Sequence, residues 1–427
     1  MKNCRFVRKK RTHVIKLKKS IRRNVVSNKR YLYLVIGMIS MLFAGVIYAW
    51  SILKVSFSEF NWTAPQLSLN YTLTMCCFCL GGLLGSVINK KIGSKVTSIL
   101  AALLTSLGFI LTGTLNGNSI ILLYIYYAVM SGLGIGITYN VIISLVGAHF
   151  PDKKGFCSGC LMMGFGASTL ILGNLANAMF QNNIIGWRKT YLILGIVMGV
   201  VLICAGLILK MPQENDTVKK TNQQKKNTTK ENFEIKDFTT KEMLGRFSFW
   251  RVFLCLICLT AVGSTVISFA KDLALSVGAN NNLATTLVGV LSVCNGLGRI
   301  LVGVLFDKLG RKFTMIFSNI LTMAAAGCVL LAVGINSLIL CIIGLVLVGM
   351  SYGSCPTVAS AITSAFYGQK HFSRNFSIMN FNLMIAAFIA TGCSSILTST
   401  GGYVVPFIVL LSLTGFALIL NFSIKRP

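Results

Sequence analysis

Long apolar stretches separated by short polar ones dominate the pattern of this chain. Crossing a hydrocarbon core takes about 20 apolar residues in a helix. Stretches of that size begin near twelve positions: Tyr31, Pro65, Val96, Ser119, Gly155, Lys189, Trp250, Leu283, Phe313, Ser337, Asn375 and Tyr403. They are too long and too continuously apolar for barrel strands, so the backbone must satisfy its hydrogen bonds within helices. The pattern predicts an all-α polytopic membrane protein with twelve transmembrane helices.

A lysine-rich polar segment divides these stretches into two sets of six. The expected organisation is a basic tail over residues 1–30, a six-helix half over 31–210, a linker over 211–247 and a second half over 248–427. The centre of the linker is polar, without apolar periodicity, which predicts disorder. Glycines recur at equivalent points of the halves, such as Gly93 with Gly310 and Gly132 with Gly349. Two related halves are expected to enclose a site near mid-membrane and to rock about it.

Composition and charge agree with this organisation. Hydrophobic residues make up 54% of the 427 residues, and the mean hydropathy is +0.74, which excludes an ordinary soluble domain. Lys and Arg outnumber Asp and Glu by 40 to 10 and lie almost entirely on one set of flanks. The exceptions are Lys54, Arg188, Lys189, Lys271 and Arg299. Because basic loops stay cytoplasmic, we expect both termini and the linker on the cytoplasmic side of the cell membrane.

The basic tail and the fourteen cysteines each invite another interpretation. A nucleic-acid arm or a cleaved signal peptide would be basic, but the apolar run after the tail is long enough to span, so the charge favours orientation and contact with anionic lipid. Two C-x-x-C spacings, at Cys157–Cys160 and Cys255–Cys258, lie in apolar stretches without accompanying His or acid. We expect packing cysteines, no metal, no cofactor and no nucleic-acid partner; a monomer is compatible with the sequence.

A conspicuous loop follows the eighth stretch. It reads Gly303-Val-Leu-Phe-Asp307-Lys308-Leu-Gly310-Arg311-Lys312 and resembles the signature loop of the major facilitator superfamily. A glycine permits a tight turn at the end of a helix, and Asp307 can pair with the basic residues and hold two helices together on the cytoplasmic side. A plain basic loop remains the alternative. The first-half counterpart has Asn89 in place of the acid, so its latch is expected to be weaker.

Within that superfamily the membrane portion is similar to the oxalate:formate antiporter family. The resemblance rests on the order and spacing of several short motifs: Tyr48-Ala-Trp50-Ser, Glu59-Phe-Asn-Trp62, Leu67 to Thr74, Gly81-Gly-Leu-Leu-Gly85, Phe150 to Gly155, Gly186-Trp-Arg188 and Phe238 to Leu244. It implies a two-half facilitator that transports a small carboxylate, and not an enzyme.

Arg299 is the most consequential single residue. It lies about eight residues, or roughly 12 Å, from the helix end at Asp307, too deep for a flanking residue. An arginine at helix centre costs at least about 2.5 to 3.5 kcal/mol and needs a polar cavity and an anionic partner. All acids lie in loops, the linker or helix ends, so a substrate carboxylate is the natural counter-ion for the guanidinium fork. A snorkelling arginine, or one that binds backbone carbonyls, is the alternative. In the family this arginine contacts the substrate.

The resemblance also implies a pocket wall of aromatic side chains. Its members would be Tyr48, Trp50, Tyr71, Tyr139 and Tyr352, an aromatic wall whose phenol donors suit a small anion. Ordinary packing competes with this interpretation for each of them, and Trp50 also suits a membrane-interface anchor.

The eleventh stretch departs from the family pattern. Oxalate transporters of the family carry a second cation there, whereas this chain has Asn380-Phe-Asn382-Leu with no Lys or Arg. A dianion would leave one carboxylate facing only amides and hydroxyls, so a monocarboxylate such as formate, lactate or pyruvate is favoured. Asn382 can still donate hydrogen bonds to a second carboxylate, so an oxalate/formate-type exchanger stays open.

Two other functions stay open. A multidrug or other small-molecule exporter shares this architecture, although proton-driven cation efflux generally needs a buried carboxylate that this chain lacks. A non-transporting membrane sensor cannot be told from a carrier by sequence.

Overall fold

The computed structural model describes residues 29–57, 59–117, 119–211 and 237–426, and every element in these ranges is helical. The first half starts with a helical segment over 29–44 and continues as follows: η1 Gly45–Ala49, α2 Trp50–Leu53, η2 Lys54–Phe57, α3 Ala64–Ile92, α4 Ser94–Thr112, α5 Ile120–Leu123, η3 Tyr124–Ser131, α6 Gly132–Gly147, α7 Lys154–Ser168, η4 Thr169–Gly173, α8 Asn174–Phe180 and α9 Gly186–Ile208.

The second half repeats this plan. Its helices are α11 Thr240–Leu244, α12 Phe247–Ser276, α13 Asn281–Gly334, α14 Leu338–Tyr367, α15 Phe372–Met379, α16 Phe381–Thr400 and α17 Val404–Ser423. Consecutive short elements such as α5, η3 and α6 form single spans, because wide π-helical turns rather than loops join them.

Eleven helices in the described ranges are long and apolar enough to cross a membrane, one fewer than expected. The difference lies in α13, a 54-residue element that contains the expected eighth and ninth spans. Gly310 interrupts its helical geometry with φ 76° and ψ 179°, a conformation that glycine adopts without strain. The element is therefore two spans joined without a separate loop, and the expected twelve are present.

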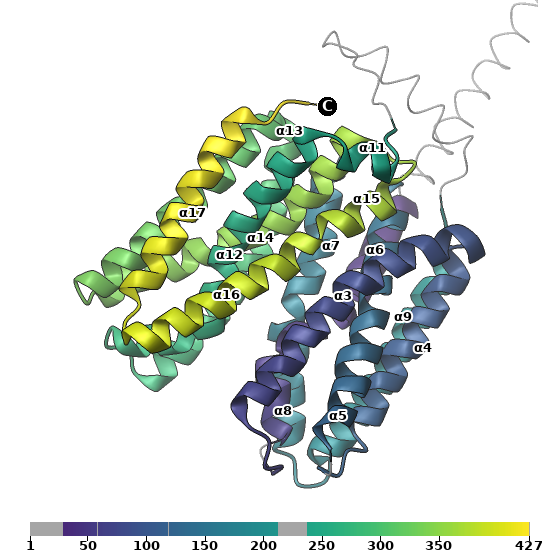
Figure 1. Cartoon of the computed structure of the whole chain (residues 1–427). Helices are drawn as coiled ribbons and strands as arrows, with labels where there is room; N and C mark the ends of the chain where they lie inside the picture. Colours follow the sequence, from purple (N-terminus) through teal and green to yellow (C-terminus); the bar gives the residue numbers. More distant parts are fainter. Residues whose placement is uncertain (1–28, 58, 118, 212–236, 427) are drawn as a thin grey trace, which may run out of the picture.

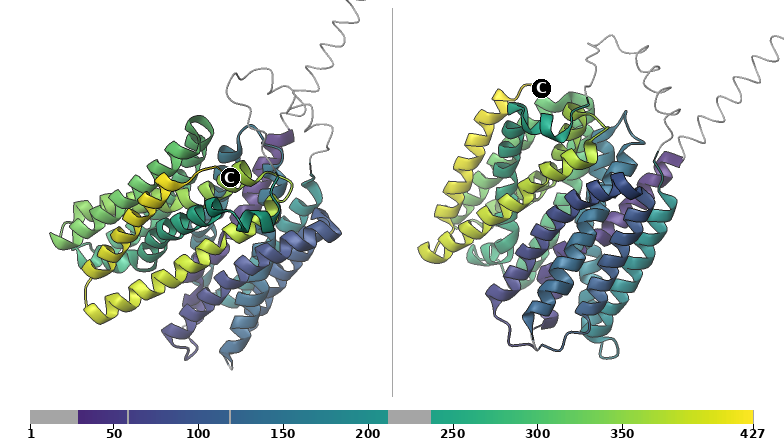
Figure 2. Two further views of the ribbon diagram at one scale, coloured as in Figure 1. Left: turned by 45° about the horizontal axis from the view of Figure 1, so that its top comes forward. Right: turned by 45° about the vertical axis from the view of Figure 1, so that its right-hand side comes forward.

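The two halves lie side by side, and they are closest at the end where the described chain breaks off for the linker (Figure 1). Toward the other end the purple-to-teal half and the green-to-yellow half diverge, which is also visible after rotation (Figure 2). Across the boundary, α7 packs on α13 and α14, while α15 packs on α3 and α6. The helix α7 of the first half thus packs on the second half, and α15, at the equivalent position of the second half, packs on the first, as the internal repeat predicts.

Large apolar side chains cover the outside of both halves. Examples are Ile121, Val200, Leu331 and Ile419, which are 57% to 71% exposed. A soluble protein rarely exposes so much contiguous apolar surface, and these side chains are placed to contact lipid.

The expected linker of residues 211–247 is folded at its end. Asp237 accepts the backbone N–H groups of Gln369 at 2.9 Å and Lys370 at 3.1 Å, and the amide of Asn375 donates to the Phe238 carbonyl. Thr239 caps the short helix α11 together with Glu242. Residues 237–246 therefore belong structurally to the second half. The expected disordered linker centre and almost all of the basic tail lie outside the described residues.

Candidate anion site between the two halves

Arg299 of α13 is 2% exposed, so its side chain does not reach the membrane surface. Its Nε donates to Oδ1 of Asn295, one helical turn earlier, at 3.0 Å. Its Nη1 donates to the backbone carbonyl of Met162, on α7 of the first half. The guanidinium thus lies on the boundary between the halves, with a neutral amide and a carbonyl as partners. No ion pair of Arg299 with an acid occurs in the part of the chain that the structure describes.

Three of the five aromatic side chains expected at the site lie near this arginine, and a fourth joins them through the other tyrosines. The charge of Arg299 acts on the hydroxyls of Tyr48, Tyr139 and Tyr352. Tyr71 interacts electrostatically with Tyr48 and Tyr352. Tyr352 hydrogen-bonds with Tyr48 of the opposite half and with Ser264 of α12. Three of these tyrosines come from the first half and one from the second, so the cluster exists only where the halves meet.

Aromatic rings support the tyrosines from behind. The ring of Tyr139 makes edge contacts with Phe78 and Phe165, each at a centroid distance of 5.1 Å, and Phe165 also contacts the ring of Tyr48 at 5.2 Å. Such rings exclude water and fix the orientation of the phenols. The arrangement offers hydroxyl donors and one cation in a setting of low polarity, which suits a small anion.

Asn382 is connected to the site through other side chains. Its Oδ1 accepts from the hydroxyl of Thr260 at 3.3 Å, and its Nδ2 donates to the Met379 carbonyl. Thr260 in turn hydrogen-bonds with the thiol of Cys355, on which the charge of Arg299 acts. The amide therefore lies at the edge of the cluster.

The structure places Trp50 elsewhere. Its indole Nε1 donates to the Leu67 carbonyl at 3.1 Å, and its ring packs on Tyr127 at 4.7 Å within the first half. The side chain is 5% exposed and fixes the end of the first span against α3. A backbone carbonyl takes its indole donor in this geometry, and a contact of the Trp50 ring with a substrate stays a prediction.

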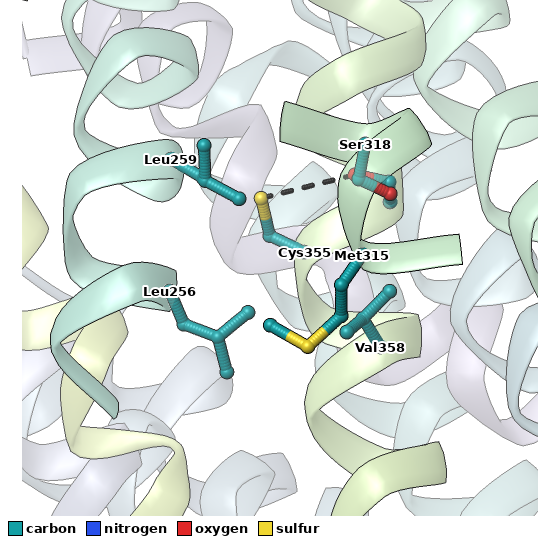
Figure 3. Close-up of a pocket in the computed structure, with 7 residues that line it drawn as sticks. Leu256, Leu259, Met315, Ser318, Cys355 and Val358 are labelled. Carbon is teal, nitrogen blue, oxygen red and sulfur yellow. Dashed lines mark hydrogen bonds between the residues drawn. The ribbon is translucent and has the colours of Figure 1, made fainter. Parts of the chain in front are cut away.

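A small cavity near the cluster is not part of the boundary (Figure 3). It lies among α12, α13 and α14 and is lined by Leu256, Leu259, Met315, Ser318, Ser354, Cys355 and Val358. No charged side chain lines it, and most of its lining is apolar, so it does not suit an anion.

Asp307 holds the halves together in a way that the sequence did not indicate. Its carboxylate accepts the backbone N–H groups of Gly155 at 2.8 Å and Phe156 at 2.7 Å, at the first turn of α7. Arg311 of the same loop instead places its guanidinium over the Phe366 ring at 5.5 Å, and Lys312 is exposed. The expected pairing of Asp307 with its basic neighbours is replaced by capping of a helix in the other half. An anion at that position also interacts favourably with the helix dipole.

Close backbone approach accompanies this cap. A Cβ added to Gly303 would collide with the carbonyl of Gly155, and one added to Gly155 with that of Gly303. The two main chains touch only because neither residue has a side chain.

The contact of α15 with α3 and α6 uses neutral groups. Asn140 of α6 donates to the Ser373 carbonyl at 2.9 Å and to the Ser377 hydroxyl at 2.8 Å, and the latter donates to the Gly82 carbonyl. No acid takes part in this network of described residues. The closure on the linker side is therefore asymmetric, with one charged cap and one neutral network.

Sequence reasoning missed several contributors to the site. Asn295, Met162, Ser264, Phe78 and Phe165 all contact a predicted site residue. Asn295 lies four residues before Arg299, a spacing that places both on one helix face. The sequence could therefore have indicated Asn295 as a partner of the arginine. The others are brought in by tertiary packing.

The fold and the boundary site together define a multi-pass membrane transporter built from two related six-helix halves. The sequence model of the Major Facilitator Superfamily matches residues 32–271 and 252–427. The chain therefore belongs to the major facilitator superfamily, as the signature loop indicated.

Similarity extends to several individual members. An uncharacterised MFS-type transporter, YhjX, of Escherichia coli K12 is 24% identical over 82% of this chain and 84% of its own. The oxalate:formate antiporter of Oxalobacter formigenes is 22% identical over 91% of this chain and 90% of its own. Human monocarboxylate transporter 12 is 25% identical over 87% of this chain and 74% of its own.

Solved structures show the same fold. The proton:xylose symporter XylE bound to 6-bromo-6-deoxy-D-glucose has a TM-score of 0.73 at 14% identity and covers 94% of this chain and 97% of its own. The transporter FucP in the outward conformation has a TM-score of 0.68 at 13% identity, covering 93% of this chain and all of its own (100%).

Proposed function

We propose that this protein moves a small carboxylate anion across the cytoplasmic membrane by alternating access, with Arg299 as the partner of the carboxylate. The observation that carries the proposal is the position of Arg299: a buried cation on the boundary between the halves, surrounded by tyrosine hydroxyls and paired with no acid in the described residues. A guanidinium binds a carboxylate through two parallel hydrogen bonds, and in a site of low polarity these are strong.

A monocarboxylate fits this site better than a dianion. The second half supplies Asn382 and Thr260 where a second cation would be needed, and these two side chains already hydrogen-bond to each other. The single negative charge of formate, lactate or pyruvate would balance the charge of Arg299, whereas the second carboxylate of oxalate would face neutral groups. The relatives named for oxalate, formate and monocarboxylates support the substrate class.

The geometry represents one end state of the transport cycle. Hydrogen bonds between the halves, among the described residues, run from the linker end to Arg299 and the Tyr48–Tyr352 pair. Toward the other end the halves diverge (Figure 1). We assign the closed end to the cytoplasm, since the basic flanks and the linker lie there. The site would then face the outside and await an external substrate.

Transport in reconstituted vesicles tests the proposal. Purified protein in proteoliposomes is given labelled formate, lactate, pyruvate or oxalate, with and without the same anion inside, and with a pH gradient as a separate condition. We expect saturable uptake of a monocarboxylate, with trans-stimulation if the mechanism is exchange. Absence of flux for every acid, in protein that is monodisperse and folded, would reject a carboxylate carrier and direct the search to drug efflux or sensing.

A further inference from the structure

Another cavity, this one polar, lies on the boundary between the halves, on the linker side of Arg299. It is lined by Ile143, Gly147, Lys154, Ser158, Ser360, Ser364, Gln369 and Phe372. Four elements contribute to it, two from each half, together with the turn after α14. Its lining holds one charged side chain, that of Lys154, and three serine hydroxyls, so its chemistry differs from that of the apolar cavity in Figure 3.

Two helix faces connect this cavity to the arginine. On α7, Lys154, Ser158 and Met162 follow each other at intervals of four residues and therefore share one face. Met162 supplies the carbonyl that binds Arg299, so Lys154 lies about 12 Å along the helix from that contact.

On α14, Ser360 and Ser364 show the same spacing and meet the α7 face. The hydroxyls of Ser158 and Ser360 lie 2.8 Å apart, and Lys154 donates to the Ser364 carbonyl. The cavity is therefore the next polar step from Arg299 toward the linker side.

Lys154 has a weak partner in the closed state. Its Nζ lies 3.4 Å from the Ser364 carbonyl, longer than an ordinary hydrogen bond. The nearby acids are engaged elsewhere: Asp307 accepts two N–H groups of α7, and Asp237 accepts two from the turn after α14. When the halves part on this side, the contact with Ser364 is lost, because the two residues belong to different halves. The ammonium then faces the opened path, and its N–H groups can donate hydrogen bonds to an anion.

We infer that Lys154, with the hydroxyls of Ser158 and Ser360, forms a second carboxylate-binding step, which takes the substrate from Arg299 on the linker side. The inference rests on the proposed function, because it concerns the same substrate. Arg299 and this step act in sequence and not on one substrate molecule, since roughly two helical turns separate them. The step lowers the cost of removing the anion from the arginine by offering a second cation before it reaches water.

Sided transport kinetics test this step. Half-saturating concentrations of the transported monocarboxylate are measured separately at the linker face and at the opposite face, for wild type, Lys154→Gln, Lys154→Arg and Lys153→Gln. Lys153 is the matched control, since it is the exposed neighbour with the same charge. We expect Lys154→Gln to raise the half-saturating concentration at the linker face about tenfold, the equivalent of one lost charge-assisted contact. The value at the opposite face stays unchanged, Lys154→Arg restores most of the affinity, and Lys153→Gln behaves as wild type.

A purely structural latch predicts the opposite sign. Loss of the Lys154–Ser364 contact would favour opening on the linker side, so the half-saturating concentration would fall there and rise at the opposite face. That result, or equal changes at both faces, would overturn the inference while the carboxylate carrier stands. If wild type transports no carboxylate at all, the proposed function itself fails. Thermal unfolding of each purified variant shows whether it is folded, and Lys154→Arg keeps the test valid if Lys154→Gln is not.

Discussion

The carboxylate of Asp307 caps the first turn of α7 across the boundary between the halves, with Gly155 N–H at 2.8 Å and Phe156 N–H at 2.7 Å. Both bonds end at a charged acceptor, and such bonds contribute about 1.5–3 kcal/mol each, against about 0.5–1.5 kcal/mol for neutral ones. The closed linker side therefore depends on one ionised side chain more than on any of its serine and amide contacts.

Substitution of this acid should open the linker side. In Asp307→Asn the cap becomes neutral, and we expect the closed state to lose about 1–3 kcal/mol. Hydrogen exchange of the amides at the start of α7 should accelerate correspondingly. Asp272→Asn, at an exposed carboxylate of α12, is the control and should leave these amides unchanged. Equal protection in Asp307→Asn and wild type would show that the cap does not hold the halves together.

Arg299 should be required for binding and not for folding. Arg299→Gln removes the charge but keeps a hydrogen-bonding side chain in a buried position, and we expect binding at least about 100-fold weaker. Arg299→Lys should recover part of it, since an ammonium lacks the planar fork. The rise in unfolding temperature that substrate causes measures its binding to each variant. Unchanged protection in Arg299→Gln would remove the residue from the site.

Gly166 should control the position of the arginine. A Cβ at this residue would lie 3.1 Å from Cζ and 3.3 Å from Nε of Arg299, so Gly166→Ala should displace the guanidinium. We expect weaker substrate binding with normal yield of folded protein. Gly327→Ala is the matched control, because nothing lies within 4 Å of its Cβ. A similar loss of binding in both variants would indicate a general effect of replacing glycine in these helices.

The Tyr48–Tyr352 pair should act as a unit. Each of Tyr48→Phe and Tyr352→Phe removes one side of a hydrogen bond that crosses the boundary. We expect each to weaken binding by about 0.5–1.5 kcal/mol, and the double variant to lose less than the sum. Binding affinities of the four proteins give the coupling energy. Strict additivity would mean that the two hydroxyls contribute separately.

A second cation should shift the choice of substrate. Asn382→Lys places an ammonium at the edge of the tyrosine cluster, where the chain now has an amide. We expect transport of oxalate to rise relative to formate or lactate, because the second carboxylate gains a partner. Competition between labelled monocarboxylate and unlabelled oxalate measures the ratio. An unchanged ratio in folded protein would show that Asn382 does not face the substrate.

The sequence predicted the helical class, the spans, the repeat and the superfamily, because lipid leaves few alternatives to apolar helices. It also singled out Arg299, since a buried cation is conspicuous in an apolar pattern. The partner of Trp50 was not predicted, because composition alone does not reveal that the Leu67 carbonyl takes its indole donor. The partner of Asp307 was missed for a related reason: backbone N–H groups are present at every position, and only tertiary structure shows which of them are free.

The spans were also less uniform than a hydropathy pattern implies. The eighth and ninth spans meet at Gly310 within α13, where a positive φ turns the chain without a separate loop, and the apolar run does not encode this conformation. The break between α15 and α16 at Asn380 is equally invisible to hydropathy, because apolar residues continue on both sides of it.

The neutral partners of Arg299 have an electrical consequence. A site with no substrate carries one uncompensated positive charge, and a monoanion cancels it, so the loaded and empty forms of the carrier differ by one elementary charge. Moving such a charge through the whole membrane field costs about 2.3 kcal/mol per 100 mV. The membrane voltage would therefore act on the return of the empty site and leave the loaded step untouched. Exchange of one monoanion for another would be electrically silent, whereas net one-way movement would respond to voltage.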